Sequence, residues 1–175
     1  MKYAVIACLL VGGCSGVGEQ IPGDGRLVVV GYDDAFETNV FGDGRTEADA
    51  VREGVRFWNV LGANLKTTDE VQPGEVASAI YMVKRDAFSW PGEHGPWGIT
   101  WAEIGYSTIY PSCVRADHSY DYDDFRSTVA HEIGHAIGLY HVSGISVMSP
   151  DHNYTDATPS PAGREEYARH YPIRG

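Results

Sequence analysis

Basic residues are scarce in this chain of 175 residues, which carries 13 Lys and Arg against 24 Asp and Glu and a formal net charge of −11. No stretch of the sequence gathers the several positive charges that neutralise nucleic-acid phosphates. We therefore expect neither nucleic acid nor an anionic membrane surface as a partner. The length suits one domain with a hydrophobic core and is short for two of ordinary size. A monomer is expected.

Long apolar runs are also lacking. The segment from Tyr3 to Val11, preceded by Lys2, is too short at about 10 residues to span a bilayer and suits the core of a signal peptide. It leads directly into Val11-Gly12-Gly13-Cys14, which resembles the lipobox of bacterial lipoproteins and implies cleavage before Cys14 and a lipid on that cysteine. The alternatives are an ordinary secretory signal, which would give a secreted protein, and a buried strand with an incidental cysteine.

Cysteine is also scarce, and the chain contains only Cys8, Cys14 and Cys113. On the lipoprotein interpretation Cys8 leaves with the signal peptide and Cys14 carries lipid, so Cys113 has no partner. A disulfide framework is thereby excluded. Ser15 follows the lipidated cysteine, and in such lipoproteins this residue favours export beyond the inner membrane. The expected location is the outer membrane or cell surface of a bacterial envelope, reached through a lipid anchor at Cys14.

The remaining patterns divide the chain into three parts: a signal peptide at 1–13, a Gly-rich tether at 14–25 and a folded catalytic domain at 26–175. Within the domain, apolar and β-branched runs predict strands at Leu27–Val30, Ala63–Thr68, Ala77–Lys84 and Trp97–Ile109, the last divided near Gly105. Capping and periodicity predict helices at Thr46–Gly62, from Asp123 or Asp124, and from Ser160-Pro161. Strands and helices in this order indicate an α+β domain.

The segment from His131 to His141 reads His-Glu-Ile-Gly-His-Ala-Ile-Gly-Leu-Tyr-His. Two histidines four residues apart on a helix lie on one face, so both imidazoles can reach the same ion. Glu132 then projects beside the ion, where a bound water would sit. Gly138 can end the helix in the left-handed conformation, and His141 can supply a third nitrogen. Three protein ligands leave a fourth position for water, which is typical of a catalytic zinc.

The pattern H-E-x-x-H-x-x-G-x-x-H resembles that of the metzincin zinc peptidases, and residues 129–141 are most similar to the matrixin branch. Metzincins also carry a methionine turn under the zinc, and Ser146-Val147-Met148-Ser149-Pro150 matches it soon after the third histidine. The predicted order of elements is similar to the family's from about residue 26 onwards. Val142, which follows the third histidine, leaves the branch open.

The resemblance implies a mixed twisted sheet, an active-site helix, a zinc cleft, a methionine turn at Met148 and a C-terminal helix. It implies one catalytic Zn²⁺ held by His131, His135 and His141. The reaction implied is peptide hydrolysis by a zinc-activated water with Glu132 as general base. The peptide or protein substrate would lie extended along the edge strand of the sheet, which we expect within Trp97 to Ile104.

Two alternatives stay open. A surface lipoprotein that binds zinc or peptides without turnover would need the histidines but not the carboxylate of Glu132, whose presence argues against it. A further metal, Ca²⁺ or a structural zinc, could be bound by His94, His118, Asp117, Asp121, Asp123 and Asp124. The competing interpretation of those residues is a solvated loop in which Asp123 or Asp124 favours the start of a helix.

Overall fold

A computed structural model describes residues 27–73, 78–84, 98–101, 106–109, 121–139, 141, 146–149 and 168. The expected signal peptide, the tether, Cys14 and the helix predicted from Ser160-Pro161 lie outside the described residues, as do His94, Asp117 and His118. No helix in the described part of the chain is long and apolar enough to cross a membrane.

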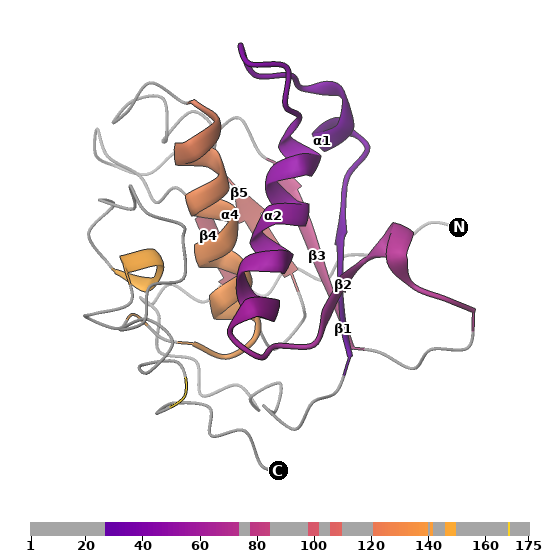
Figure 1. Cartoon of the computed structure of the whole chain (residues 1–175), viewed down its shortest axis with the longest axis vertical. Coiled ribbons are helices and arrows are strands. Elements are labelled where there is room, and N and C mark those ends of the chain that lie inside the picture. The colour runs from indigo at the N-terminus through magenta and orange to yellow at the C-terminus, as the bar shows by residue number, and fades with distance from the viewer. Residues whose placement is uncertain are drawn as a thin grey trace.

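The described residues form a mixed α+β structure in which helices cover a five-stranded sheet (Figure 1). The strands are β1 (Val28–Tyr32), β2 (Leu65–Thr67), β3 (Ser78–Lys84), β4 (Gly98–Trp101) and β5 (Tyr106–Ile109). The α-helices are α1 (Ala35–Thr38), α2 (Glu47–Val60) and α4 (Tyr122–Ala136), and the 3₁₀ turns are η1 (Thr68–Glu70) and η3 (Ser146–Met148).

The strand order in the sheet is β2-β1-β3-β5-β4. Four strands run parallel, whereas β4 pairs antiparallel with β5, with Gly98 opposite Ile109 and Thr100 opposite Ser107. The prediction that Trp97–Ile109 is divided is confirmed, because one strand ends at Trp101 and the next begins at Tyr106. The prediction that its first half is an edge strand is also confirmed within the described part of the chain, where β4 lies at the end of the sheet.

Helix α2 begins where the capping pattern predicts. The Thr46 hydroxyl accepts a hydrogen bond from the Asp49 backbone N–H at 3.1 Å, and the Asp49 carboxylate accepts one from the Thr46 N–H at 2.8 Å. This reciprocal pair satisfies two N–H groups that the first turn would otherwise leave without partners. The helix ends at Val60, and Gly62 turns the chain with a φ of 104°.

Helix α4 begins at Tyr122, one residue before Asp123, which confirms the predicted start near Asp123 or Asp124. Its N-cap is Asp121, whose carboxylate accepts a hydrogen bond from the Asp124 N–H at 2.9 Å. This start places Tyr122 inside the helix, where its buried ring packs edge-on against Phe41 with centroids 5.4 Å apart. Burial of this ring is a tertiary effect that helix capping preferences do not contain.

Helices α2 and α4 lie side by side over one face of the sheet (Figure 1). They approach closely at Gly54, where a Cβ atom would lie 3.0 Å from Ile133 Cδ1 and 3.5 Å from the Ala130 backbone. One turn along α2, the indole N–H of buried Trp58 donates to the Ala130 carbonyl at 2.8 Å. This packing fixes the height and rotation of α4 above β4 and β5.

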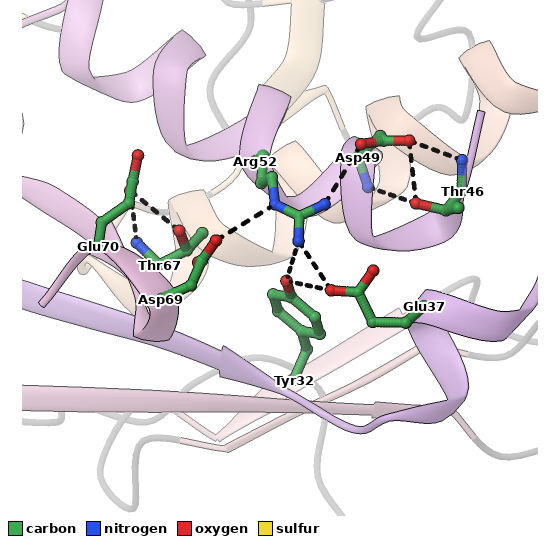
Figure 2. Close-up of polar contacts among 8 residues, drawn as sticks. All are labelled: Tyr32, Glu37, Thr46, Asp49, Arg52, Thr67, Asp69 and Glu70. Carbon is green, nitrogen blue, oxygen red and sulfur yellow. Dashed lines mark hydrogen bonds and ion pairs between the residues drawn. The ribbon is translucent and has the colours of Figure 1, made fainter.

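Arg52 ties α2 to three neighbouring elements (Figure 2). Its guanidinium donates to the Tyr32 hydroxyl at 2.9 Å and to Glu37 at 2.7 Å, and it pairs with Asp69 at 3.7 Å. These partners lie at the end of β1, in α1 and in η1. Burial, together with the hydrogen bond to Glu37, raises the pKa of Tyr32 to about 12, so this hydroxyl stays protonated at neutral pH.

We predict that Gly54→Val lowers the free energy of unfolding by about 1–3 kcal/mol, because the added methyl groups overpack the contact between α2 and α4. Chemical denaturation measures the change. The matched control is Gly42→Val, since a Cβ at exposed Gly42 meets nothing within 4 Å. Equal stability of the two variants would contradict the close approach at Gly54.

Candidate metal centre

The structure brings together the three histidines that the sequence predicts as ligands. The Nε2 atoms of His131 and His135 are 2.9 Å apart, and the Nε2 atom of His141 lies 3.3 Å from the first and 3.2 Å from the second. The first two histidines lie on successive turns of α4. The third is reached because Gly138 adopts a φ of 96°, which ends the helix as predicted.

Hydrogen bonds at the Nδ1 atoms of His131 and His135 determine which ring nitrogen carries the proton. His131 Nδ1 lies 2.7 Å from the Val147 carbonyl oxygen, and His135 Nδ1 lies 2.8 Å from the Leu139 carbonyl oxygen. A carbonyl only accepts, so each Nδ1 carries a hydrogen and donates it. In the neutral ring the Nε2 atom then presents a lone pair.

The pKa shifts agree with neutral rings. Burial lowers the pKa of His135 to about 4 and also lowers the pKa of His141. Two lone pairs held about 3 Å apart repel one another unless a cation lies between them. Tetrahedral metal coordination with metal–nitrogen bonds of 2.0–2.1 Å would place the nitrogens about 3.3–3.4 Å apart. The observed triangle is close to that size, so the three histidines can hold one metal ion.

The turn at η3 supports this site in two ways. Its Val147 carbonyl orients His131, and buried Met148 packs against α4 at Gly134. A Cβ at Gly134 would lie 2.4 Å from Met148 Sδ and 2.7 Å from the Trp58 ring. The turn therefore contacts the helix between the two histidines, and the expectation that Met148 packs close to the metal ligands agrees with this placement.

Glu132 is buried, with an exposed fraction of 3%. Its Oε2 atom accepts a hydrogen bond from the Thr100 hydroxyl at 2.5 Å. On the Oε1 side the backbone of Gly98 leaves no room for a side chain, because a Cβ there would lie 2.4 Å from Oε1. The carboxylate predicted as the general base thus contacts the edge strand β4.

Burial raises the pKa of Glu132 to about 8, and the hydrogen bond from Thr100 acts in the opposite direction. A cation held by the neighbouring histidines would favour the charged carboxylate and oppose the effect of burial. The pKa of Glu132 therefore depends strongly on burial and on whether a cation is bound nearby. Such a group is suited to accepting and returning a proton.

The sequence interpretation missed several residues that shape this site: Gly98, Thr100, Ser107, Gly134, Leu139 and Val147. Two of them, Gly98 and Thr100, are two positions apart in a strand and so share a face, but no sequence pattern indicates that this face meets Glu132. Among the acids considered for a further metal, Asp121 caps α4 and Asp123 pairs with Arg126 at 3.2 Å. Asp123 and Asp124 both lie in the first turn of α4, which agrees with the interpretation that one of these two acids favours the start of the helix.

No protein-family model matches the chain, and no curated protein matches it. The assignment of the centre therefore rests on its own geometry and on the motif residues.

We predict that the protein binds one equivalent of Zn²⁺ and that the ion raises the free energy of unfolding by about 2.7 kcal/mol at a free concentration 100 times Kd. Calorimetric titration and thermal unfolding measure both effects. His131→Ala, His135→Ala and His141→Ala should each weaken binding, whereas the control His170→Ala should not. Unchanged zinc occupancy in all three ligand variants would exclude this centre.

Proposed function

We propose that this protein is a zinc-dependent endopeptidase of the metzincin type, similar to the matrixin branch. The observation that carries the proposal is the convergence of three histidine Nε2 atoms, two of them fixed as lone-pair donors by backbone carbonyls. A glutamate directly follows the first ligand on the same helix. Three nitrogen ligands from the protein leave a fourth position for water or substrate, as in catalytic zinc sites.

In the proposed reaction His131, His135 and His141 hold the metal. A zinc ion bound there would supply Lewis-acid chemistry, lowering the pKa of a water and polarising the peptide carbonyl. Glu132 accepts the proton of the attacking water and passes it to the leaving nitrogen. Burial of Glu132 excludes bulk solvent from this proton transfer. No covalent intermediate with the protein is required.

The position of β4 supports an extended peptide as substrate. Among the strands of the described residues it lies at the edge of the sheet and has a neighbour, β5, on one side only. A peptide added on the other side would form main-chain hydrogen bonds with little regard for its sequence. Because Gly98 and Thr100 of β4 contact Glu132, a peptide on this edge would lie next to the proposed general base.

We predict that Glu132→Gln retains zinc and the fold but lowers the rate of peptide hydrolysis by about 10²- to 10⁴-fold, because an amide cannot accept the proton. Cleavage of a mixed peptide library, measured beside elemental analysis, tests this. Glu37→Gln, on the half-exposed side chain in α1, is the control. A wild-type protein that binds zinc and peptides but cleaves none would instead be a binding lipoprotein.

We further propose that the protein is exported and lipid-anchored at Cys14, in the outer membrane or at the cell surface. The support is the order of Lys2, the short apolar run, the two glycines and the cysteine. A lipid-anchored peptidase would act on peptides or proteins at the envelope surface.

We predict that mass spectrometry of the protein made in bacteria shows loss of residues 1–13 and an added acyl mass. Cys14→Ser should abolish the added mass and release the protein from membranes. Cys8→Ser and Cys113→Ser should leave the lipid in place, since the proposal assigns no lipid to either. A soluble mature form that begins at another residue would contradict the anchor.

A further inference from the structure

The sheet face of β4 and β5 that meets α4 carries a short chain of hydroxyl groups leading to Glu132. Thr100 Oγ1 lies 2.5 Å from Glu132 Oε2 and 2.8 Å from Ser107 Oγ. Thr100 and Ser107 are opposite one another in the antiparallel pair, so their side chains lie on the same face of the sheet. Ser107 is fully buried and Thr100 is partly buried.

The direction of these hydrogen bonds follows from proton counting. In the ionised form that a general base requires, the Glu132 carboxylate only accepts, so the single hydroxyl proton of Thr100 goes to Oε2 at 2.5 Å rather than to the Glu132 carbonyl oxygen at 3.2 Å. The Thr100 oxygen is then free to accept, and Ser107 donates to it. The order of donation is Ser107 to Thr100 to Glu132, and it holds one oxygen of the carboxylate in place.

Gly98 restrains the other side of the same carboxylate. A Cβ at this position would lie 2.4 Å from Glu132 Oε1 and 2.6 Å from Cδ and Cγ. The glutamate side chain therefore packs directly on the strand backbone, and even alanine at position 98 would displace it. Gly98 leaves space for the Glu132 carboxylate, and Thr100, two residues further along the same strand, donates a hydrogen bond to it.

We propose that Gly98, Thr100 and Ser107, here called the β4 seat, are positioning residues that fix the carboxylate of Glu132 for proton transfer. The inference rests on the proposed function, in which Glu132 is the general base. Gly98 and Thr100 belong to β4, the strand expected to bind the substrate peptide, and Ser107 belongs to the neighbouring β5, so a displacement of β4 would also displace the base. Binding of the peptide and orientation of the base thus depend on one element.

The kinetic test compares three variants of the zinc-loaded protein. Thr100→Val removes the hydroxyl at nearly constant volume and should lower kcat by about 10- to 100-fold with little change in KM. Thr100→Ser keeps the hydroxyl and should restore most of kcat. Thr108→Val is the matched control, because Thr108 is buried on the neighbouring strand and its hydroxyl has no hydrogen-bond partner among the residues that the structure describes. Zinc content should be the same in all of them.

A second readout does not depend on activity. In metal-free protein labelled with ¹³C at glutamate Cδ, the Glu132 signal is identified by its absence in Glu132→Gln. Thr100→Val and Gly98→Ala should shift or broaden this signal, whereas Thr108→Val and Gly42→Ala should not. If Thr100→Val fails to fold, Ser107→Ala takes its place, since it removes the donor to Thr100.

The outcomes separate the two proposals. A wild type that cleaves no peptide would overturn the proposed function, while the carbon signal would still decide whether β4 orients the carboxylate. An unchanged carbon signal in Thr100→Val and Gly98→Ala would overturn the β4 seat, as would a kcat in Thr100→Val equal to that of Thr108→Val. A loss of kcat that Thr100→Ser restores, together with a shifted signal, would support it.

Discussion

The candidate centre depends on holding imidazole lone pairs directed at one point, although lone pairs in this arrangement repel one another. Hydrogen bonds at the opposite ring nitrogens hold two of the rings: the Val147 carbonyl accepts from His131 Nδ1, and the Leu139 carbonyl accepts from His135 Nδ1. Each carbonyl belongs to a turn that closely follows the helix in the chain. The geometry is thus set by backbone groups whose positions depend on the ends of α4 and η3, and a metal ion would relieve the repulsion that remains.

Close packing against α2 and η3 fixes the position of helix α4. Trp58 and Met148 both reach the backbone of α4 at Gly134, and Gly54 brings α2 against the same helix. At each contact a glycine, which has no side chain, lets the two elements approach closely. Such contacts tolerate little added volume. The hydrogen bond of Arg52 to Tyr32 attaches α2 to the sheet, and its ion pair with Glu37 attaches α2 to α1. The three candidate ligand histidines are therefore supported by packing that is continuous from α2 to the candidate metal centre.

Much of the fold could be predicted because its signals are local. The capping pair of Thr46 and Asp49, the helix end at Gly138 and the β-branched strand beginning at Val28 each depend on a few neighbouring residues. The start of α4 lies close to the predicted Asp123 or Asp124, but the packing of Tyr122 against Phe41, more than eighty positions away, is not a local signal. Local preferences do not contain such a contact. The short helix α1 was not predicted at all, since its four residues show no periodicity.

The sequence by itself determined the candidate ligand set, because the spacing of His131, His135 and Gly138 fixes which side chains share a helical face and where the chain turns. It also determined Glu132 as the neighbouring acid. Only the tertiary structure decided what that acid contacts: the hydroxyl of Thr100 and the bare backbone of Gly98 come from a strand more than thirty residues earlier. The physical reason is that helical spacing is a property of one segment, whereas the contact between a helix and a sheet edge depends on the packing of the whole domain.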